Sequence, residues 1–257
     1  HLGNKSHHYS KIRLWGSIGF ILSVSILGIL FETISIEAMP IALIITMTGI
    51  WLMSLTVPES AAQHLKSDHQ PLTHLLKQPS VLAFFAICFL TLLSHGPYYT
   101  FYTIYLEQHG YGRTLIGQLW ALGVIAEIIV FLLMHRWLPR YGIRVVLIIS
   151  LILSTLRWLL IGFFPDSLAL LFFAQILHAA SFGSFHAVAI TWVHQHFTGK
   201  NQARGQALYS SIGFGAGGVL GSLLSGYFWV SPGPTMTFLM AAITTFFATL
   251  IALRWLK

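Results

Sequence analysis

Long apolar segments alternate with short polar connections along almost the whole chain. A helix needs about 20 mostly apolar residues to cross the hydrocarbon core of a bilayer. Residues 205–253 carry no Asp, Glu, Lys or Arg, but this run is too long for one helix, and Pro and Gly within 231–234 divide it in two. Six runs precede it, at 14–31, 38–57, 79–106, 114–134, 145–165 and about 167–190. The pattern predicts eight transmembrane helices, with both ends of the chain on one side of the membrane.

The basic residues are concentrated on one side of this predicted topology. If the N-terminus is cytoplasmic, twelve of the 14 Lys and Arg residues fall on the cytoplasmic side, and only Arg113 falls in an outer connection. The twelve are Lys5, Lys11, Arg13, Lys66, Lys77, Arg136, Arg140, Arg144, Lys200, Arg204, Arg254 and Lys257. An excess of cytoplasmic Lys and Arg is typical of membrane proteins. We therefore expect a multi-pass protein with both ends of this chain cytoplasmic.

The composition excludes an ordinary soluble domain. Apolar residues make up 56% of the chain and charged residues only 8%, whereas soluble domains carry about 25% charged residues. The formal charge of +7 follows the loop pattern, so it does not indicate a nucleic-acid partner. The one cysteine, Cys88, lies inside an apolar run, so no disulfide framework is expected. The predicted fold class is an all-α membrane protein whose surroundings are the lipid bilayer.

No motif in the chain indicates an enzyme, a metal site or a cofactor. The chain lacks HExxH, GxSxG and a P-loop. Its clustered histidines, such as His7 with His8 and His194 with His196, do not have a firm metal-ligand spacing. We therefore expect no catalytic residues, no metal and no cofactor.

Two ionisable residues, Glu127 and Arg157, lie deep inside predicted spans. Charged side chains are costly at the bilayer centre, so they usually face a cavity or a partner and mark function. At 1.5 Å per residue, Glu127 lies roughly 20 Å and Arg157 roughly 10 Å from the outer end of its helix. This difference predicts a bridging group or water between them rather than a direct ion pair. The structural alternative is a buried pair that only fixes helix packing.

Histidines and tyrosines lie near the predicted depth of Glu127. His95 and His178 each fall roughly 16 Å from the outer side, and imidazole can relay protons near neutral pH. The third predicted span carries one stripe of polar aromatic side chains at i, i+3, i+4 and i+7, made of His95, Tyr98, Tyr99 and Tyr102. Pro97 permits a kink beside it. The stripe predicts a cavity for an aromatic or amphipathic ligand, with plain helix packing or an interfacial aromatic belt as alternatives.

Several segments resemble members of the major facilitator superfamily that are related to the phenylpropionate permease. Residues 9–17 (YSKIRLWGS) are similar to the beginning of that family's fifth helix, and residues 119–127 (LWALGVIAE) to its eighth. Residues 95–99 (HGPYY), 156–158 (LRW) and 175–178 (QILH) resemble its seventh, ninth and tenth helices. The resemblance covers nearly the whole chain.

The resemblance implies a fold of twelve helices in two halves of six. This chain would hold helices five to twelve, with the N-terminal four helices missing. Residues 1–57 would be the last two helices of the N-terminal half, 58–78 the central cytoplasmic loop and 79–257 the six-helix C-terminal half. The small-residue stripe of Gly213, Gly217 and Gly221 would then face a helix of the absent part.

By the same resemblance, the chain belongs to a proton-coupled symporter of the bacterial inner membrane, functional as a monomer at full length. Glu127, Arg157 and His178 are similar to a Glu, Arg and His set in lactose-permease-like proton symporters, although a second acidic residue of that set has no counterpart here. Glu127 and His178 would carry the proton, with His95 assisting.

The implied substrate is a small organic molecule, with an aromatic carboxylate such as 3-phenylpropionate as the leading candidate. Arg157 would attract its anionic group, and the pocket would be shaped by Tyr98, Tyr99, Tyr102, Trp120 and Gln175. A sugar or nucleoside symporter and a drug exporter are alternatives within transport. A membrane receptor and an intramembrane enzyme are the alternatives outside it.

Overall fold

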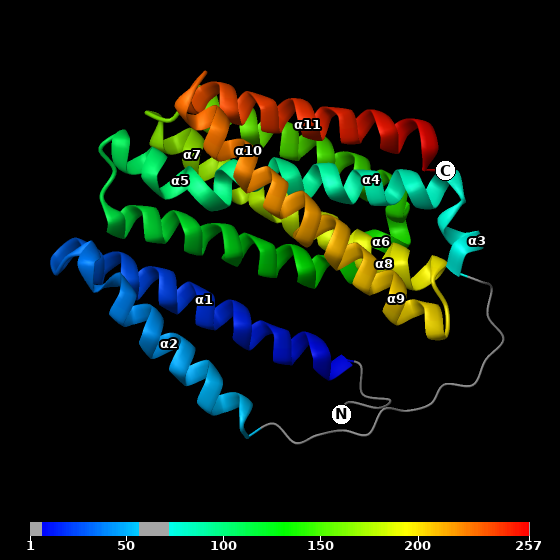
Figure 1. The fold of residues 1–257 in the computed structure, drawn as a ribbon, viewed down its shortest axis with the longest axis horizontal. Coiled ribbons are helices and arrows are strands. Elements are labelled where there is room, and N and C mark those ends of the chain that lie inside the picture. The colour runs from blue at the N-terminus through cyan, green and yellow to red at the C-terminus, as the bar shows by residue number, and fades with distance from the viewer. Residues whose placement is uncertain (1–6, 57–71, 257) are drawn as a thin grey trace.

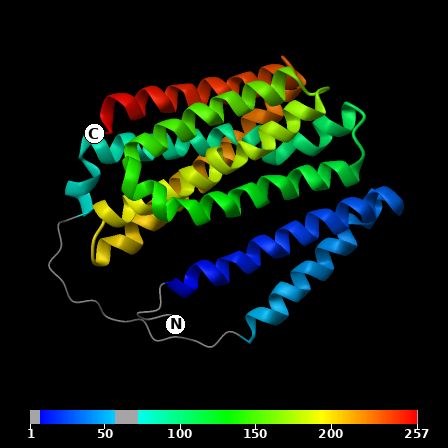
Figure 2. The same ribbon diagram turned by 180° about the vertical axis from the view of Figure 1, so that it is seen from behind.

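A pair of helices lies along one side of a larger helical bundle (Figures 1 and 2). The computed structural model describes residues 7–56 and 72–256, and every regular element within them is helical. The pair consists of α1 (His7–Thr33) and α2 (Met39–Ser54), joined by the short η1 (Ile36–Ala38). Both views place α1 between α2 and the bundle, and α1 packs along α6 (Arg113–Phe163).

The bundle is built from the remaining elements, which follow α3 (Leu72–Leu76). Helix α11 packs against both α4 and α6, and α10 packs against α5. Besides α6, its members are α4 (Pro79–Ser94), α5 (Gly96–Gln108), α7 (Leu168–Ile176), η2 (Ala179–Ser184), α8 (Phe185–His196), α9 (Lys200–Tyr209), η3 (Ser210–Gly218), α10 (Val219–Val230) and α11 (Pro234–Trp255).

The longest helix, α6, contains two membrane crossings. Its 51 residues would span about 76 Å if straight, more than twice the ~30 Å thickness of a hydrocarbon core. Gly142 interrupts it with a φ of 78°, and two helices meet there at a kink. The two parts of α6 run back along each other (Figure 2). Seven helices among the described residues are long and apolar enough to cross a membrane. With α6 counted twice, the prediction of eight transmembrane helices is confirmed.

Three of the other crossings contain a local break in the helix. The crossing Pro79–Gln108 changes from α4 to α5 at His95. Pro97 follows two residues later, and its missing N–H leaves a carbonyl of α4 without the usual helical donor. The crossing Leu168–His196 contains η2, a π-helical segment directly after His178, and Asn201–Val230 contains η3, another. π-Helical segments occur frequently at functional sites. The breaks therefore indicate His95 and His178 as candidate functional residues.

Two apolar clusters form the core of the bundle. One includes Phe84, Phe85, Leu147 and Trp192, and the other includes Tyr102, Trp158 and Phe238. His95 separates them along the chain, since Leu92 belongs to the first cluster and Tyr98 to the second. The boundary between the two apolar clusters therefore contains a buried polar side chain, His95, and is a place where others can lie beside it.

The glycine stripe packs within the bundle, so the expectation that it faces an absent helix is wrong. A Cβ added at Gly217 would lie 2.6 Å from the Phe89 carbonyl oxygen, and one at Gly221 would lie 2.3 Å from the Leu93 carbonyl oxygen. Only glycine permits this approach, which brings the η3–α10 crossing into backbone contact with α4. Small residues predict close packing correctly but do not identify the partner helix.

The proposed division of the chain at residues 58–78 stays a prediction. Residues 58–71 of this segment lie outside the described residues, and the remainder forms α3 and its connection to α4.

Candidate functional site

The cation Arg157 is completely buried in the second crossing of α6. Its Nε donates to the Ala174 carbonyl oxygen at 3.1 Å, and its Nη1 donates to the Ser181 Oγ at 3.2 Å. The guanidinium carbon lies 4.1 Å from the ring centroid of Tyr98 and 4.4 Å from that of Trp158. Aromatic faces stabilise a desolvated cation, but Nη2 has no hydrogen-bond partner among the described residues. Arg157 therefore keeps an unused donor inside the membrane.

An acid and an imidazole face each other between α6 and the start of η2. Glu127 Oε2 lies 3.8 Å from His178 Nε2, and both side chains are almost completely buried. The hydroxyl of Ser181 accepts from Arg157 and donates to the His178 backbone carbonyl at 3.3 Å. Ser181 therefore connects the cation to the backbone of His178, whose ring faces the acid. Ser181 itself was not among the predicted site residues.

Two glycines create the space for this pair. A Cβ at Gly123 would lie 3.2 Å from the Gln175 Oε1 and 3.3 Å from His178 Cδ2. A Cβ at Gly183 would lie 3.0 Å from Glu127 Cγ. All three distances are tighter than ordinary contacts, so the small residues let α6 and η2 approach closely. Gly123 belongs to the eighth-helix motif, but its spacing alone does not indicate which side chains it adjoins.

His95 lies beside His178, as their predicted depths suggest. The two ring centroids are 6.5 Å apart, and the His95 ring meets Trp158 edge-on at 4.9 Å. Its Nδ1 lies 2.8 Å from the Thr91 carbonyl oxygen and donates to it in the tautomer that satisfies both groups. The Nε2 of His95 and the Nδ1 of His178 have no hydrogen-bond partner among the described residues. Each imidazole therefore has one nitrogen free to bind or exchange a proton.

The predicted tyrosine stripe divides into a buried part and an exposed part. Tyr98 is buried and donates its hydroxyl hydrogen to the Gln175 Oε1 at 3.0 Å. Tyr102 is also buried, whereas half of the Tyr99 surface is exposed. Trp120 reaches over from α6 and donates from Nε1 to the Thr103 Oγ1 at 3.2 Å. Tyr99 and Trp120 therefore present aromatic surface to a cavity, while Tyr98, Tyr102 and Gln175 support them from behind.

A cavity of about 320 Å³ gives access to the acid and the imidazole. Glu127, His178, Tyr99 and Trp120 form its wall on the bundle side. Gly16, Ser17 and Phe20 of α1 close the opposite side. Arg157 does not line this cavity. A ligand bound here would thus touch Glu127 and His178 directly and would be separated from Arg157 by other side chains.

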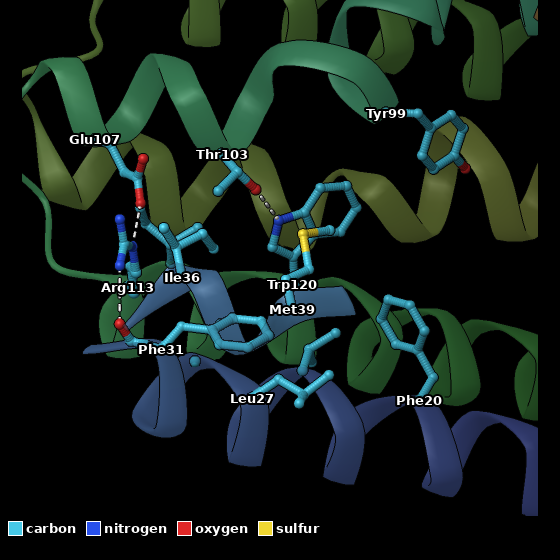
Figure 3. Close-up of a pocket in the computed structure, with 14 residues that line it drawn as sticks. Phe20, Leu27, Phe31, Ile36, Met39, Tyr99, Thr103, Glu107, Arg113 and Trp120 are labelled. Carbon is cyan, nitrogen blue, oxygen red and sulfur yellow. Dashed lines mark hydrogen bonds and ion pairs between the residues drawn. The ribbon is translucent and has the colours of Figure 1, made fainter. Parts of the chain in front are cut away.

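A second cavity of about 420 Å³ continues from the first toward the connection between α5 and α6 (Figure 3). Phe20, Tyr99 and Trp120 line both cavities. In the close-up, Leu27 and Phe31 of α1 and Met39 of α2 face the Trp120 ring across an apolar space. The two cavities together form an aromatic-walled passage between α1 and the bundle.

The passage ends at a set of polar contacts around Arg113. Its Nε donates to Glu107 Oε1 at 2.6 Å, and its Nη1 donates to the Phe31 carbonyl oxygen at 2.8 Å (Figure 3). The Thr114 backbone N–H donates to Glu32 Oε2 at 2.6 Å. These contacts fasten the end of α1 to α5 and α6 at this end of the passage.

The predicted site residues therefore form one connected region, although they do not all line a cavity. Arg157, Glu127, His178 and His95 form a buried polar centre, and Tyr99 and Trp120 border the passage. Trp158, Ser181 and Phe20 were not predicted. Trp158 follows Arg157 in the chain, but sequence position alone does not show that its ring covers the guanidinium. Within residues 7–56 and 72–256, no group of three or more His, Cys, Asp or Glu side chains is arranged so that it could hold a metal ion.

Comparison with known proteins places this arrangement in a family. The family model described as "MFS_1 like family" matches residues 1–240. A protein of Escherichia coli (strain K12) described as "probable 3-phenylpropionic acid transporter" is 27% identical over 239 residues, which cover 91% of this chain and 62% of that protein. Maltose permease of Geobacillus stearothermophilus is 24% identical over 234 residues, which cover 88% of this chain and 58% of the permease. The chain thus spans about three fifths of the length of these curated relatives.

A solved structure has the same fold. The crystal structure of a variant of the nucleoside transporter NupG superposes with a TM-score of 0.75 and 20% sequence identity. The superposition covers 97% of this chain and 68% of that chain. At this level of identity the likeness concerns the arrangement of the helices.

Proposed function

The chain belongs to the MFS_1 like family of the major facilitator superfamily, and we propose that it binds substrate and proton in a secondary transporter of small organic anions. The proposed substrate is an aromatic carboxylate, which the name of the Escherichia coli relative, a probable 3-phenylpropionic acid transporter, supports. The observation that carries the proposal is the buried Arg157 with its unused Nη2 donor, which lies behind the side chains that line an aromatic-walled cavity.

We propose that the substrate's ring enters first and its carboxylate afterwards reaches Arg157. Tyr99 and Trp120 offer aromatic faces in the cavity, where a phenyl ring can stack. The Tyr98 ring covers the guanidinium at 4.1 Å. A rotation of Tyr98 would replace this cation–π contact with a charge-assisted hydrogen bond to the carboxylate, which is the stronger interaction.

Proton coupling is assigned to the pair of Glu127 and His178. Both line the cavity, and their oxygen and nitrogen lie 3.8 Å apart, close enough for a small movement to form a hydrogen bond. A carboxylate within the bilayer is much less costly when it is protonated or paired. We propose that a proton bound by Glu127 leaves through His178 when the passage opens to the opposite side.

A neutral substrate is the second candidate. The cavity wall includes Glu127 but neither Arg157 nor another cation, so an anion gains no direct cationic contact in this conformation. Three relatives are named as maltose, xanthosine and nucleoside permeases, and these names support a sugar or nucleoside. In that case Arg157 would hold Tyr98 and Ser181 in place and would not contact the substrate.

Uptake by membrane vesicles distinguishes these candidates. The chain is produced alone and together with the four helices that the family resemblance places before it, and uptake is driven by an inward proton gradient. Labelled 3-phenylpropionate is then competed with its neutral amide, 3-phenylpropionamide, and with uridine. We expect saturable uptake of the carboxylate, weaker competition by the amide and none by uridine. Equal competition by acid and amide would refute the role of Arg157, and accumulation of uridine instead would support the neutral substrate.

A further inference from the structure

An apolar groove on the outer flank of the bundle does not belong to the passage. It has a volume of about 580 Å³ and lies between the two crossings of α6 and the segment that joins α7 to η2. Its lining includes small residues, among them Ala126, Ala179 and Ala180. Large side chains such as Ile129 and Ile149, each about half exposed, also line it. The groove is therefore an elongated depression open to the hydrocarbon of the bilayer.

The part of the groove below its aromatic rim has the length of one leaflet. The lining on the first crossing of α6 extends from Ala126 to Tyr141, and the part from Ala126 to Trp137 corresponds to about 16 Å of helix at 1.5 Å per residue. Half of a ~30 Å hydrocarbon core is about 15 Å. Trp137 and Tyr141 line the end of the groove that leads to the Gly142 turn, and exposed Trp and Tyr are typical of the membrane–water interface. One acyl chain of a phospholipid fits this length, with its headgroup at Trp137 and Tyr141.

This end of the groove is basic. The Arg140 guanidinium carbon lies 5.5 Å from the ring centroid of Tyr141, which lines the groove. Arg136, next to Trp137, and Arg140 are both exposed, and neither has a carboxylate partner among the described residues. Acidic residues within 7–56 and 72–256 are Glu32, Glu37, Glu107, Glu127 and Asp166. None of them lies in the turn between the two crossings of α6, so positive charge at the groove mouth is not neutralised by described neighbours.

From this combination of the length of the groove, its aromatic rim and two exposed arginines with no carboxylate partner among the described residues, we propose that the groove is a binding site for an anionic phospholipid. One acyl chain occupies the apolar depression, and the phosphate-containing headgroup binds Arg136 and Arg140. Basic pockets between transmembrane helices at a membrane surface favour anionic headgroups, because each nearby arginine adds electrostatic attraction. The site is independent of the proposed transport function, since it lies on another face of α6 and shares no lining residue with the passage.

The proposal is tested by titrating the purified chain in detergent with dioleoyl phosphatidylglycerol and counting bound lipids by native mass spectrometry. Dioleoyl phosphatidylcholine, which has the same acyl chains and a neutral headgroup, is the lipid control. We expect phosphatidylglycerol to bind more tightly. The double substitution Arg136→Gln with Arg140→Gln should weaken its binding more than tenfold, since each arginine contributes roughly fivefold. The surface substitution Arg204→Gln, on α9, should leave binding unchanged.

A second pair of variants tests the acyl-chain half of the site. Ile149→Trp places a larger side chain in the groove, whereas Ile152→Trp changes a residue of the same helix that is equally exposed but outside the groove. We expect only Ile149→Trp to weaken binding, and to weaken it for both lipids. Equal binding of the two lipids, or an equal loss in Arg204→Gln, would overturn the proposal. Displacement of phosphatidylglycerol by millimolar glycerol 3-phosphate would also overturn it, because the site would then bind a free phosphate ester.

Discussion

Arg157 is the residue on which substrate recognition depends in this account. Its guanidinium is held by two directed hydrogen bonds and by the faces of Tyr98 and Trp158. These contacts use the planar shape of the group as well as its charge, and an ammonium ion cannot reproduce them. The unused Nη2 is the donor assigned to the substrate carboxylate.

We predict that Arg157→Ala and Arg157→Lys both lose transport of the carboxylate while the protein still inserts in the membrane. The expected loss is roughly 10- to 100-fold, because a hydrogen bond to a charged group contributes about 1.5–3 kcal/mol. Initial uptake rates, divided by the amount of protein in the membrane fraction, measure it. Normal uptake by Arg157→Lys would show that charge alone suffices and that the planar contacts do not matter.

The depth of each residue along its helix could be predicted from the sequence. The neighbouring helix that each side chain faces could not. Counting residues placed Glu127, His95 and His178 at similar depths, and the structure brings the three residues into one polar centre. The same count could not show that Arg157 would turn toward Ala174 and Ser181, or that Tyr99 would be exposed while Tyr98 is buried. Rotation of a helix about its axis is set by the neighbours against which it packs, and one sequence does not identify them.

Helices α1 and α6 are in close contact beside the passage, near Arg113. A Cβ at Gly117 would lie 2.5 Å from the Val24 carbonyl oxygen, and one at Gly28 would lie 2.9 Å from the Arg113 carbonyl oxygen. The two backbones therefore touch here, and the Arg113 contacts reinforce them. Under the proposed transport function, one part of the fold moves against another, so we expect the contact between α1 and α6 to separate during transport.

We predict that Gly117→Leu separates α1 from α6 near this crossing. The added side chain must move about 1 Å to reach an ordinary contact distance of 3.4 Å. Distances between spin labels at the exposed positions Ile29 and Gln118, measured by double electron–electron resonance, should lengthen. The matched control is Gly19→Leu, since nothing lies within 4 Å of a Cβ at Gly19. An unchanged distance distribution in Gly117→Leu would contradict the close packing.

The apolar runs and the helix-breaking residues predicted the elements well. The length of the runs is set by the thickness of the bilayer, and the breaks are set by the backbone geometry of Pro and Gly. The apolar runs gave the crossings, and Pro97 marked the break at His95. The π-helical segments η2 and η3 were not predicted, since no residue type requires them. The glycine stripe was assigned to the wrong partner for a related reason. A stripe of glycines can pack closely against any neighbouring helix. That the neighbour is α4 follows only from the assembled bundle.

At the scale of the whole molecule, the distribution of basic residues predicts which side of the membrane each loop occupies. The crossing Leu168–His196 offers a matched pair of exposed positions at its two ends, Asp166 and Gln195. We predict that a membrane-impermeant maleimide labels Asp166→Cys in intact cells and labels Gln195→Cys only after permeabilisation. Each variant carries Cys88→Ser, which removes the native buried thiol. The opposite labelling pattern would mean that the topology is inverted.

Coupling of substrate movement to proton movement through Glu127 is the central claim, and one measurement tests it most directly. The chain is co-produced with the four helices that the family resemblance places before it, and 3-phenylpropionate is added to vesicles without a pre-formed gradient. We predict that the external medium becomes more alkaline as substrate enters, because each carboxylate is accompanied by a proton. In Glu127→Gln this alkalinisation should disappear, while exchange of external for internal substrate continues. Substrate entry with no alkalinisation in the unmodified protein, or undiminished alkalinisation in Glu127→Gln, would contradict the account.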